Sequence, residues 1–323
     1  MTIDGGDIMI ADFTRSIIRR SRLIMPVNVK EFVNKAYLRN ADAVVLDLED
    51  SVPASQKLTS RELIKDYIHI AAKGGSDTLV RVNHTEQLLM GDIEATIWPG
   101  LAGIMLPKVE SAKQVMAVDQ VITKLEQQRG LPIGKITIGV IVETAKGYLK
   151  LEEIAQASDR IDSITLGNED FSLDTGIELS EETYYGLLIP RIQVVLVARS
   201  IGRIPMGLMG SLANFRDYDS YENNAKLAYK HGYLGASCIH PRNVEILNRS
   251  FSPAQKDIEH SLEIKELFEK GIKEGRASVA LNGKMIDYVH FEKANRIIER
   301  AAMIEELEMK KRIARESVMK MEG

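Results

Sequence analysis

The sequence has little that would suit an oxidising compartment or a membrane. It contains one cysteine, Cys238, so no disulfide can form within the chain, which is typical of proteins in a reducing compartment. No apolar stretch approaches the roughly 20 residues needed to cross a bilayer. The first residues include Asp4, Asp7 and Asp12, a pattern unlike a secretory signal or a transit peptide. We therefore expect a cytoplasmic protein.

The sequence also lacks an excess of charge of one sign. Its 42 lysines and arginines are balanced by 46 acidic residues, and the formal net charge is −4. This balance predicts no general attraction to nucleic acid or to an anionic membrane. Basic residues do gather at Arg15, Arg19, Arg20 and Arg22, which leaves open a polyanionic ligand at one spot. The hydrophobic content of 45% is typical of a globular protein.

Eight short apolar runs recur along the chain, and a longer segment with helical periodicity follows each one. Runs rich in Val, Ile and Leu without polar alternation are typical of strands buried on both faces, as in a parallel sheet. The predicted strands are Leu23–Pro26, Ala43–Leu48, Thr78–Val82, Ala102–Pro107, Ile136–Val142, Ser163–Gly167, Ile204–Gly207 and Gly235–His240. Predicted helices between them include Val29–Arg39, Ser111–Arg129, Tyr184–Ile201 and Phe215–His231.

Eight strand–helix repeats in about 250 residues match the size of a TIM barrel. The competing architecture, a doubly wound sheet, normally has a glycine-rich turn after its first strand, and residues 23–29 contain no glycine. We therefore predict an α/β fold, with a TIM (β/α)8 barrel over residues 15–250 and a C-terminal helical extension over residues 251–323.

The extension should contain two helices separated by a turn at Gly283. The first is predicted over Ser252–Glu274, with its first residue as the N-cap and Pro253 at the next position. The second covers Asp287–Met319 and is long and charged. It has an apolar stripe formed by Ile297, Ile298, Ala301, Ile304 and Leu307. Periodicity favours equally a contact with an adjacent subunit and packing on the protein's own barrel.

Functional side chains of TIM barrels come from the C-terminal ends of the strands and the loops that follow. Among the polar residues there, Glu143 and Asp170 end the fifth and sixth predicted strands, so their carboxylates should converge at the barrel mouth. Two carboxylates that leave positions for water and substrate oxygens are typical of a Mg²⁺ site. The alternative is that they pair with Arg22, Arg81 or Lys108.

Arg81 interrupts a buried strand, which is costly unless the charge is paired or functional. Its guanidinium could hold a carboxylate or stabilise an enolate oxygen, and it could also pair with Asp47 or Glu49. Those two acids should point the same way and could support a cation and its waters. We interpret Asp50 as part of a solvated loop. A lone histidine such as His240, which precedes a proline, is more often structural than a substrate contact.

Taken together, these segments resemble the HpcH/HpaI aldolase–citrate lyase superfamily, in the branch with the citrate lyase β subunit and the malyl-CoA and citramalyl-CoA lyases. The resemblance runs in order from Arg20 to about Ala302. The matching segments are Arg20–Pro26, Val45–Val52, Val80–Asn83, Leu106–Glu110, Val142–Gly147, Leu166–Phe171, Ile239–Pro241 and Gly283–Asp287.

The resemblance implies that Glu143 and Asp170 bind Mg²⁺, which a small 2-oxo acid chelates through its carboxylate and keto oxygens. It implies that Arg81 contacts the acid or a thioester enolate. It also implies that Asp287 enters the site from a neighbouring subunit as the acid/base, in a homo-oligomer such as a trimer or hexamer. We count Asp47 with the catalytic residues. The predicted substrate contacts are Arg22, Arg81, Glu49, Asn168 and Glu169.

The predicted reaction is cleavage of a 3-hydroxyacyl thioester of CoA or acyl carrier protein to a 2-oxo acid and an acetyl thioester. Two alternatives stay open: a citrate lyase β subunit that works only in a complex with an acyl carrier protein, and a synthase or thioesterase with the same metal site. Gly235-Ala236 and Asn243 depart from the glycine–lysine pair and the glutamine often seen in the family. These changes affect the expected substrate or carrier contacts and leave the metal site intact.

Overall fold

The barrel is formed by eight parallel strands in a computed structural model that describes residues 12–180, 183–212 and 214–322. Each strand lies within two residues of its predicted position, which confirms the TIM barrel. The strands are β1 (Ser21–Pro26), β2 (Ala43–Asp47), β3 (Asp77–Arg81), β4 (Leu101–Leu106), β5 (Thr137–Val142), β6 (Ile161–Leu166), β7 (Ile204–Met206) and β8 (Ala236–Cys238).

The barrel closes between its last two strands. Seven neighbouring pairs run in the order β7-β6-β5-β4-β3-β2-β1-β8, and a parallel bridge between Met206 and Gly235 joins the two ends. The Gly207 amide donates to the Gly235 carbonyl at 2.9 Å. A side chain at Gly235 would lie 2.2 Å from the Arg19 carbonyl oxygen, so glycine allows this close approach of two strands.

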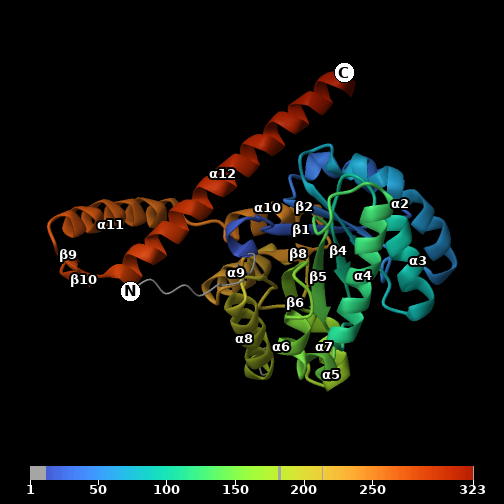
Figure 1. Cartoon of the computed structure of the whole chain (residues 1–323), viewed down its shortest axis with the longest axis horizontal. Coiled ribbons are helices and arrows are strands. Elements are labelled where there is room, and N and C mark those ends of the chain that lie inside the picture. The colour runs from blue at the N-terminus through green and yellow to red at the C-terminus, as the bar shows by residue number, and fades with distance from the viewer. Residues whose placement is uncertain (1–11, 181–182, 213, 323) are drawn as a thin grey trace.

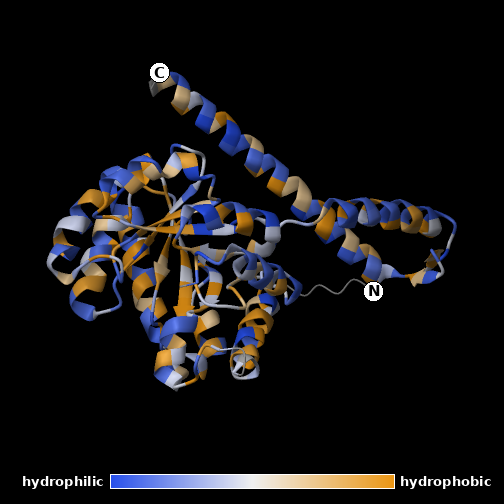
Figure 2. Ribbon diagram, turned by 180° about the vertical axis from the view of Figure 1, so that it is seen from behind, coloured by the Kyte–Doolittle hydropathy of each residue, from blue (hydrophilic) through white to orange (hydrophobic). Residues whose placement is uncertain are grey.

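Helices cover the outside of the barrel and bury the main core against the strands (Figure 1). In Figure 2 the central strands are largely hydrophobic, whereas the surrounding helices mix hydrophobic and hydrophilic residues, as amphipathic cover does. The helices are α1 (Lys30–Asn34), α2 (Lys57–Ala72), α3 (Glu86–Thr96), α4 (Ala112–Gln128), α5 (Ala145–Tyr148), α6 (Leu151–Ala155), α7 (Asn168–Thr175), α8 (Tyr184–Ser200), α9 (Tyr218–Lys230) and α10 (Pro241–Ser250). The short 3₁₀ turns are η1 (Phe13–Arg15), η2 (Ala36–Arg39) and η3 (Ala54–Gln56).

Two helical predictions differ from the structure in detail. The helix expected over 29–39 is split into α1 and η2, which ends at Asn40 in the left-handed region at φ 57°. In the extension, α11 (Gln255–Lys273) has Ala254 rather than Ser252 at its N-cap. The Ser252 hydroxyl instead donates to the Asn248 carbonyl at 2.6 Å and accepts from Arg20 at 3.0 Å. It therefore ties the barrel to the start of the extension.

The extension forms an arm. After α11 come the antiparallel strands β9 (Val279–Leu281) and β10 (Lys284–Ile286), a hairpin that the sequence analysis missed beyond its turn at Gly283. The long helix α12 (Tyr288–Glu322) then returns along α11 and crosses an end of the barrel (Figure 1). Among the described residues, no helix is long and apolar enough to span a membrane.

A buried ion pair and a hydrogen bond hold the second half of α12 on its own barrel. Lys311 Nζ lies 2.7 Å from Asp42 Oδ1, and both side chains are fully buried. Asp42 also accepts from Arg20 Nε at 2.8 Å, and Lys311 donates to the Asn40 carbonyl at 3.1 Å. Asp42 immediately precedes β2, so α12 packs at the N-terminal end of the strands. The alternative that the tail packs on its own barrel therefore holds for this part of α12.

Replacement of Lys311 should show how strongly α12 is held. Lys311→Ala leaves Asp42 with Arg20 as its remaining cationic partner, and we expect the free energy of unfolding to fall by about 2–3 kcal/mol. The matched control is Lys310→Ala, at an exposed position on the same helix, which should change stability by less than about 0.5 kcal/mol. Urea unfolding followed by circular dichroism measures both values; equal effects would contradict this prediction.

Candidate active site

Acidic residues from three strand ends meet around one lysine at the barrel mouth. Lys108, which follows β4, places its Nζ 3.2 Å from Glu49 and 3.4 Å from Asp170. Its backbone amide donates to Glu143 Oε2 at 2.8 Å. Glu49 follows β2, Glu143 follows β5, and Asp170 lies in the first turn of α7 after β6. The C-terminal ends of parallel strands thus bring together residues that are far apart in the sequence.

The backbone at Lys108 has an unusual conformation, which lets its amide contact Glu143 while its side chain contacts Glu49. Its φ of +51° lies in the left-handed region, which is uncommon for a residue other than glycine and tends to occur at functional sites. This turn after Pro107 directs the amide toward Glu143 and the side chain toward Glu49. The sequence marks Lys108 as a polar residue directly after the fourth predicted strand and as a possible partner of the acids, but it predicts no role of its own for this residue.

The surroundings of Glu143 strongly affect the ionisation of its carboxylate. It is 5% exposed. Burial, then the negative charges of Glu49 and Asp170, raise the pKa of Glu143 to about 7. Its position depends on Gly167, because a Cβ there would lie 2.4 Å from Glu143 Oε1. The strand end of β6 therefore leaves room for this side chain.

Arg81 is fixed at the end of β3 by Asp47. Its Nε and Nη2 each donate to one Asp47 oxygen at 2.7 Å, a bidentate pair. Burial acts to lower the pKa of Arg81, but its hydrogen bonds and charge contacts with Asp47 outweigh this and raise it. The remaining Nη1 lies 3.2 Å from Glu49 and 3.4 Å from Asp50. The ion pair that was the alternative reading of Arg81 is therefore present.

Asp47 is buried behind this arginine. It has no exposed surface, and its oxygens also accept from the backbone amides of Glu49 at 3.0 Å and Ser51 at 3.1 Å. Burial acts to raise the pKa of Asp47, but the hydrogen bonds and the positive charge of Arg81 outweigh this effect and lower the pKa overall. These contacts describe a carboxylate that positions Arg81. The direct catalytic role predicted for Asp47 stays a prediction.

Two residues that are predicted to contact the substrate, Asn168 and Glu169, form hydrogen bonds with the loop that follows β7. The Asn168 amide donates to the Gly210 carbonyl at 3.2 Å, and its oxygen accepts from Arg191 Nε at 3.2 Å. The Glu169 carboxylate accepts from the Ser211 hydroxyl. Both residues thus connect the start of α7 to the neighbouring loop, and their contact with a substrate is untested.

Arg22, a predicted substrate contact, does not lie at the acidic mouth, and its contact with a substrate is untested. It is the second residue of β1, and its side chain is 1% exposed inside the barrel. It donates to the Ser163 hydroxyl at 2.7 Å and lies 3.8 Å from Asp162. Burial lowers the pKa of Arg22 to about 10. Its place near the N-terminal ends of β1 and β6 keeps it away from Glu143 and Asp170.

His240 and Asp287 both occupy helix N-caps. His240 Nδ1 accepts from the Arg242 amide at 3.3 Å, and its ring stacks on Phe215. This structural role is the one expected for His240. Asp287 Oδ1 accepts from the Val289 and His290 amides at the start of α12. Asp287 thus lies between β10 and α12, in the part of the arm that is away from its own barrel (Figures 1 and 2).

The donor set at the mouth fits a magnesium ion. Among the described residues, no three histidine, cysteine or carboxylate side chains form a ready-made metal cluster. Mg²⁺ is commonly held by one or two carboxylates, with water and substrate oxygens completing the octahedron. Glu143 and Asp170 both contact Lys108 and could supply these two carboxylates. A divalent cation would also offset the repulsion that raises the pKa of Glu143.

The eight parallel strands define the architecture as a TIM barrel, and the acidic mouth lies at the C-terminal ends of the strands, where enzymes of this architecture have their active sites. The chain belongs to the HpcH/HpaI aldolase/citrate lyase family, which matches residues 20–241. The family predicted from the sequence motifs is thereby confirmed.

Curated relatives with similar sequences are lyases. The chain is 31% identical to the citrate lyase subunit beta of Haemophilus influenzae, over 88% of this chain and 97% of that protein. It is 29% identical to the L-malyl-CoA/beta-methylmalyl-CoA lyase of Rhodobacter capsulatus, over 88% and 95%. Among solved structures, CitE from Mycobacterium tuberculosis in complex with magnesium, acetoacetate and coenzyme A has a TM-score of 0.69 and 25% identity, over 89% and 99%.

The raised pKa of Glu143 has a measurable effect on stability. Since the folded protein holds this proton more tightly than the unfolded chain, the stabilisation is complete below about pH 4.5 and is lost as the pH rises toward 7. In metal-free protein, Glu143→Gln keeps the group neutral. Its free energy of unfolding relative to wild type should therefore increase by about 2–3 kcal/mol from pH 5 to pH 8.

Urea unfolding in the presence of EDTA at these two pH values measures the difference. Glu152→Gln, at an exposed carboxylate on α6, is the control and should show no such change. A wild-type-to-Glu143→Gln difference that stays constant between pH 5 and pH 8 would show that Glu143 ionises normally.

Proposed function

We propose that this protein is a Mg²⁺-dependent carbon–carbon lyase that cleaves a 3-hydroxyacyl thioester to a 2-oxo acid and an acetyl thioester. The observation that carries the proposal is the meeting of Glu49, Glu143 and Asp170 around Lys108, with Arg81 beside them. The names of the relatives, citrate lyase subunit beta and malyl-CoA lyase, support the same reaction type.

Glu143 and Asp170 would hold the Mg²⁺. The citrate lyase beta subunit of Mycobacterium tuberculosis has been solved with oxaloacetate and magnesium, at 26% identity to this chain, which supports the choice of magnesium. When bound, the ion would polarise the keto oxygen of the 2-oxo acid and neutralise its carboxylate. Glu49 lies within reach of both Lys108 and Arg81, so it would orient these two cations toward the bound acid.

Arg81 would bind the developing enolate. Asp47 occupies its Nε and Nη2, so Nη1 is the donor that faces the acidic mouth. A guanidinium held in this way needs no reorganisation when negative charge forms, and its effect is therefore greatest in the transition state. In this proposal Asp47 acts through Arg81 as a positioning residue.

Cleavage would break the bond between the hydroxyl carbon and the thioester α-carbon. The hydroxyl gives its proton to Asp287 and becomes the keto oxygen of the 2-oxo acid, and the electron pair of the broken bond forms the thioester enolate. Asp287, as the acid/base, returns a proton to the enolate carbon and gives the acetyl thioester.

Asp287 would act in the site of a neighbouring subunit. It lies between β10 and α12, and Figure 1 shows that these elements meet in the part of the arm that is away from its own barrel. Beside it, Met285, Tyr288 and Val289 are 64%, 62% and 71% exposed. On the barrel, Leu173 is 83% exposed on α7, three residues after Asp170. We propose that these apolar groups pack together in a homo-oligomer, for which the resemblance favours a trimer or a hexamer.

Malyl-, citramalyl- and citryl-thioesters are the candidate substrates, and CoA or an acyl carrier protein is the carrier. The similarity to citrate lyase β subunits favours one alternative, a subunit that works only with an acyl carrier partner. A synthase or thioesterase with the same metal-enolate site is a further alternative. We also propose a cytoplasmic location, in keeping with a single, buried cysteine, Cys238.

The decisive assay is acetyl-CoA release from malyl-, citramalyl- and citryl-CoA, with Mg²⁺ and then with EDTA. Cleavage of one thioester that EDTA abolishes supports the lyase and identifies its oxo acid. Folded protein that is silent on all three CoA thioesters contradicts a free-CoA lyase. The same assay with the acyl carrier protein thioester then tests the complex subunit.

Removal of either carboxylate should abolish the activity found in that assay. We expect Glu143→Ala and Asp170→Ala each to reduce kcat/KM at least about 1000-fold, because the cation then loses one of its two protein ligands. The control is Glu153→Ala on α6, an exposed carboxylate that should retain activity. Normal turnover by either site variant, with an unchanged circular dichroism spectrum, would disprove the metal assignment.

Mixed oligomers test the role of Asp287. Asp287→Ala and Glu143→Ala subunits are each expected to be inactive alone. After mixing and reassembly, some sites combine an intact Glu143 with an intact Asp287 from the neighbour, so partial activity should return. Mass spectrometry verifies that mixed oligomers have formed; inactivity of verified mixtures would indicate that Asp287 does not act across an interface.

A further inference from the structure

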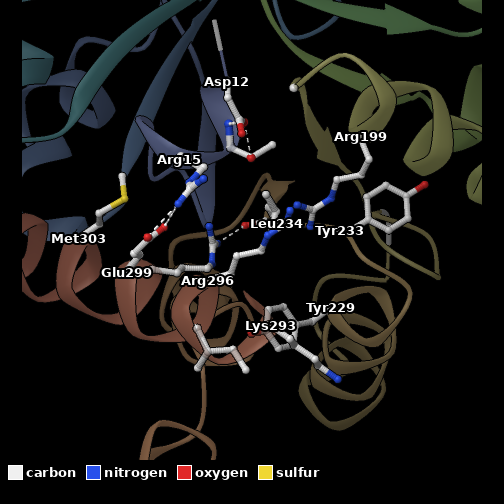
Figure 3. Close-up of a pocket in the computed structure, with 14 residues that line it drawn as sticks. Asp12, Arg15, Arg199, Tyr229, Tyr233, Leu234, Lys293, Arg296, Glu299 and Met303 are labelled. Carbon is white, nitrogen blue, oxygen red and sulfur yellow. Dashed lines mark hydrogen bonds and ion pairs between the residues drawn. The ribbon is translucent and has the colours of Figure 1, made fainter. Parts of the chain in front are cut away.

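A second cavity lies at the end of the barrel opposite the acidic mouth. It has a volume of about 510 Å³ and opens between the N-terminal residues, the end of α8 and the first half of α12 (Figure 3). Gly202 and Leu234 line it, and they precede β7 and β8, so the cavity is at the N-terminal ends of the strands. Its volume is within the range of small-molecule sites, which is about 300–1000 Å³.

The walls of this cavity carry an excess of positive charge. Five cationic side chains line it, from Arg15, Arg199, Lys293, Arg296 and Arg300. Two acidic side chains, Asp12 and Glu299, also line it, which leaves an excess of three positive charges in a chain whose formal net charge is −4. Figure 3 shows Arg15, Arg199 and Arg296 around the same space, although they come from three separate segments. Of the basic cluster noted in the sequence, only Arg15 contributes.

Among the described residues, the two carboxylates that line the cavity form an ion pair with only one of these cations. Glu299 accepts from Arg15 Nη2 at 2.6 and 2.8 Å, so this pair is internally balanced. In the part of the chain that the structure describes, Lys293 and Arg296 have no ion pair or hydrogen bond. Both lie on the exposed rim of the cavity on α12.

Arg300 lies deeper in the cavity than Lys293 and Arg296, and one of its buried hydrogen-bond donors is unsatisfied. Its Nη2 donates to the carbonyl oxygens of Leu234 at 2.8 Å and Phe251 at 3.3 Å. Its Nε is buried and, within the described residues, has no hydrogen-bond partner. A buried unsatisfied donor is unfavourable, and an anion in the cavity would bring an acceptor.

The lowered pKa values of Arg199 and Arg300 agree with positive charge in the cavity that nearby carboxylates do not offset. Burial, then the positive charge of Arg296, lowers the pKa of Arg199. Burial lowers the pKa of Arg300 to about 10, and the charges of Arg199 and Arg20 act in the same direction. An anion placed among them would offset this repulsion.

We propose that this cavity is a binding site for a multiply charged phosphate anion, such as the pyrophosphate group of a phosphorylated metabolite. Guanidinium groups match phosphate oxygens in geometry and can donate two hydrogen bonds at once, and Lys293 adds a point charge at the rim. The site is separate from the acidic mouth and does not depend on the proposed lyase reaction.

Titration of the full-length protein with inorganic pyrophosphate tests the site. Isothermal calorimetry at constant ionic strength, with NaCl as the reference, should detect binding by the wild type. The variant Lys293→Gln/Arg296→Gln removes two exposed cations from the cavity rim and should bind pyrophosphate at least tenfold more weakly. Because pyrophosphate binds the folded state, it should also raise the Tm of the wild type more than that of this variant.

The matched control removes the same charge from the same helix at a distance from the cavity. Arg312→Gln/Lys320→Gln changes two exposed cations in the second half of α12 and should keep the wild-type affinity within twofold. Three results would overturn the proposal: no pyrophosphate binding by the wild type at millimolar concentration, unchanged affinity of the rim variant, or an equal loss in both variants. The last two would mean that pyrophosphate binds elsewhere or responds only to net charge.

Discussion

Repulsion among buried carboxylates is the constraint on which the mouth of this barrel depends. Glu49 and Glu143 are both at most 5% exposed, and Asp170 lies close to the same lysine. Negative charges collected at low dielectric must be offset by a proton or by a cation. The pKa of Glu143 is raised to about 7, so a proton can neutralise this carboxylate. Lys108 and Arg81 are the cations that lie beside Glu49. A divalent cation held by Glu143 and Asp170 would be a further way to offset this negative charge.

The same constraint extends down through the barrel. Asp47, which is fully buried, accepts hydrogen bonds from two nitrogens of Arg81. These bonds fix the guanidinium so that its third nitrogen lies beside Glu49 at the mouth. At the other end, Arg19 pairs with Asp162 and Arg20 pairs with Asp42, again in buried positions. Buried ion pairs contribute little net stability, but loss of one partner is costly, so these pairs limit the alternatives available to the strand ends.

Sequence patterns predicted the strands well because a strand buried on both faces must be apolar throughout. Glu143 and Asp170 were recognisable for the same reason, since each ends such a run. Arg22 and Arg81 look alike in sequence, as single charges in apolar strands. Only the register separates them: Arg22 is the second of six strand residues, and Arg81 is the last of five.

Other features depend on contacts that no local pattern encodes. The turn at Lys108 needs a positive φ without a glycine to announce it. The hairpin of β9 and β10 has strands of three residues, too short for a clear alternation. The basic cavity combines residues of the N-terminal segment, α8 and α12, whose proximity follows only from the closed barrel and the returning helix.

The buried contact between Lys311 and Asp42 joins residues 269 positions apart, and this has a consequence during synthesis of the chain. All eight barrel strands precede residue 239, so they have been synthesised before α12 leaves the ribosome. Until then, Asp42 has Arg20 but not its second cation, and the N-terminal ends of the strands stay uncovered. A helix that is made after all the barrel strands thus completes the first strands of the fold. A chain released before Lys311 keeps an uncovered surface at the N-terminal ends of these strands, which a quality-control system could recognise.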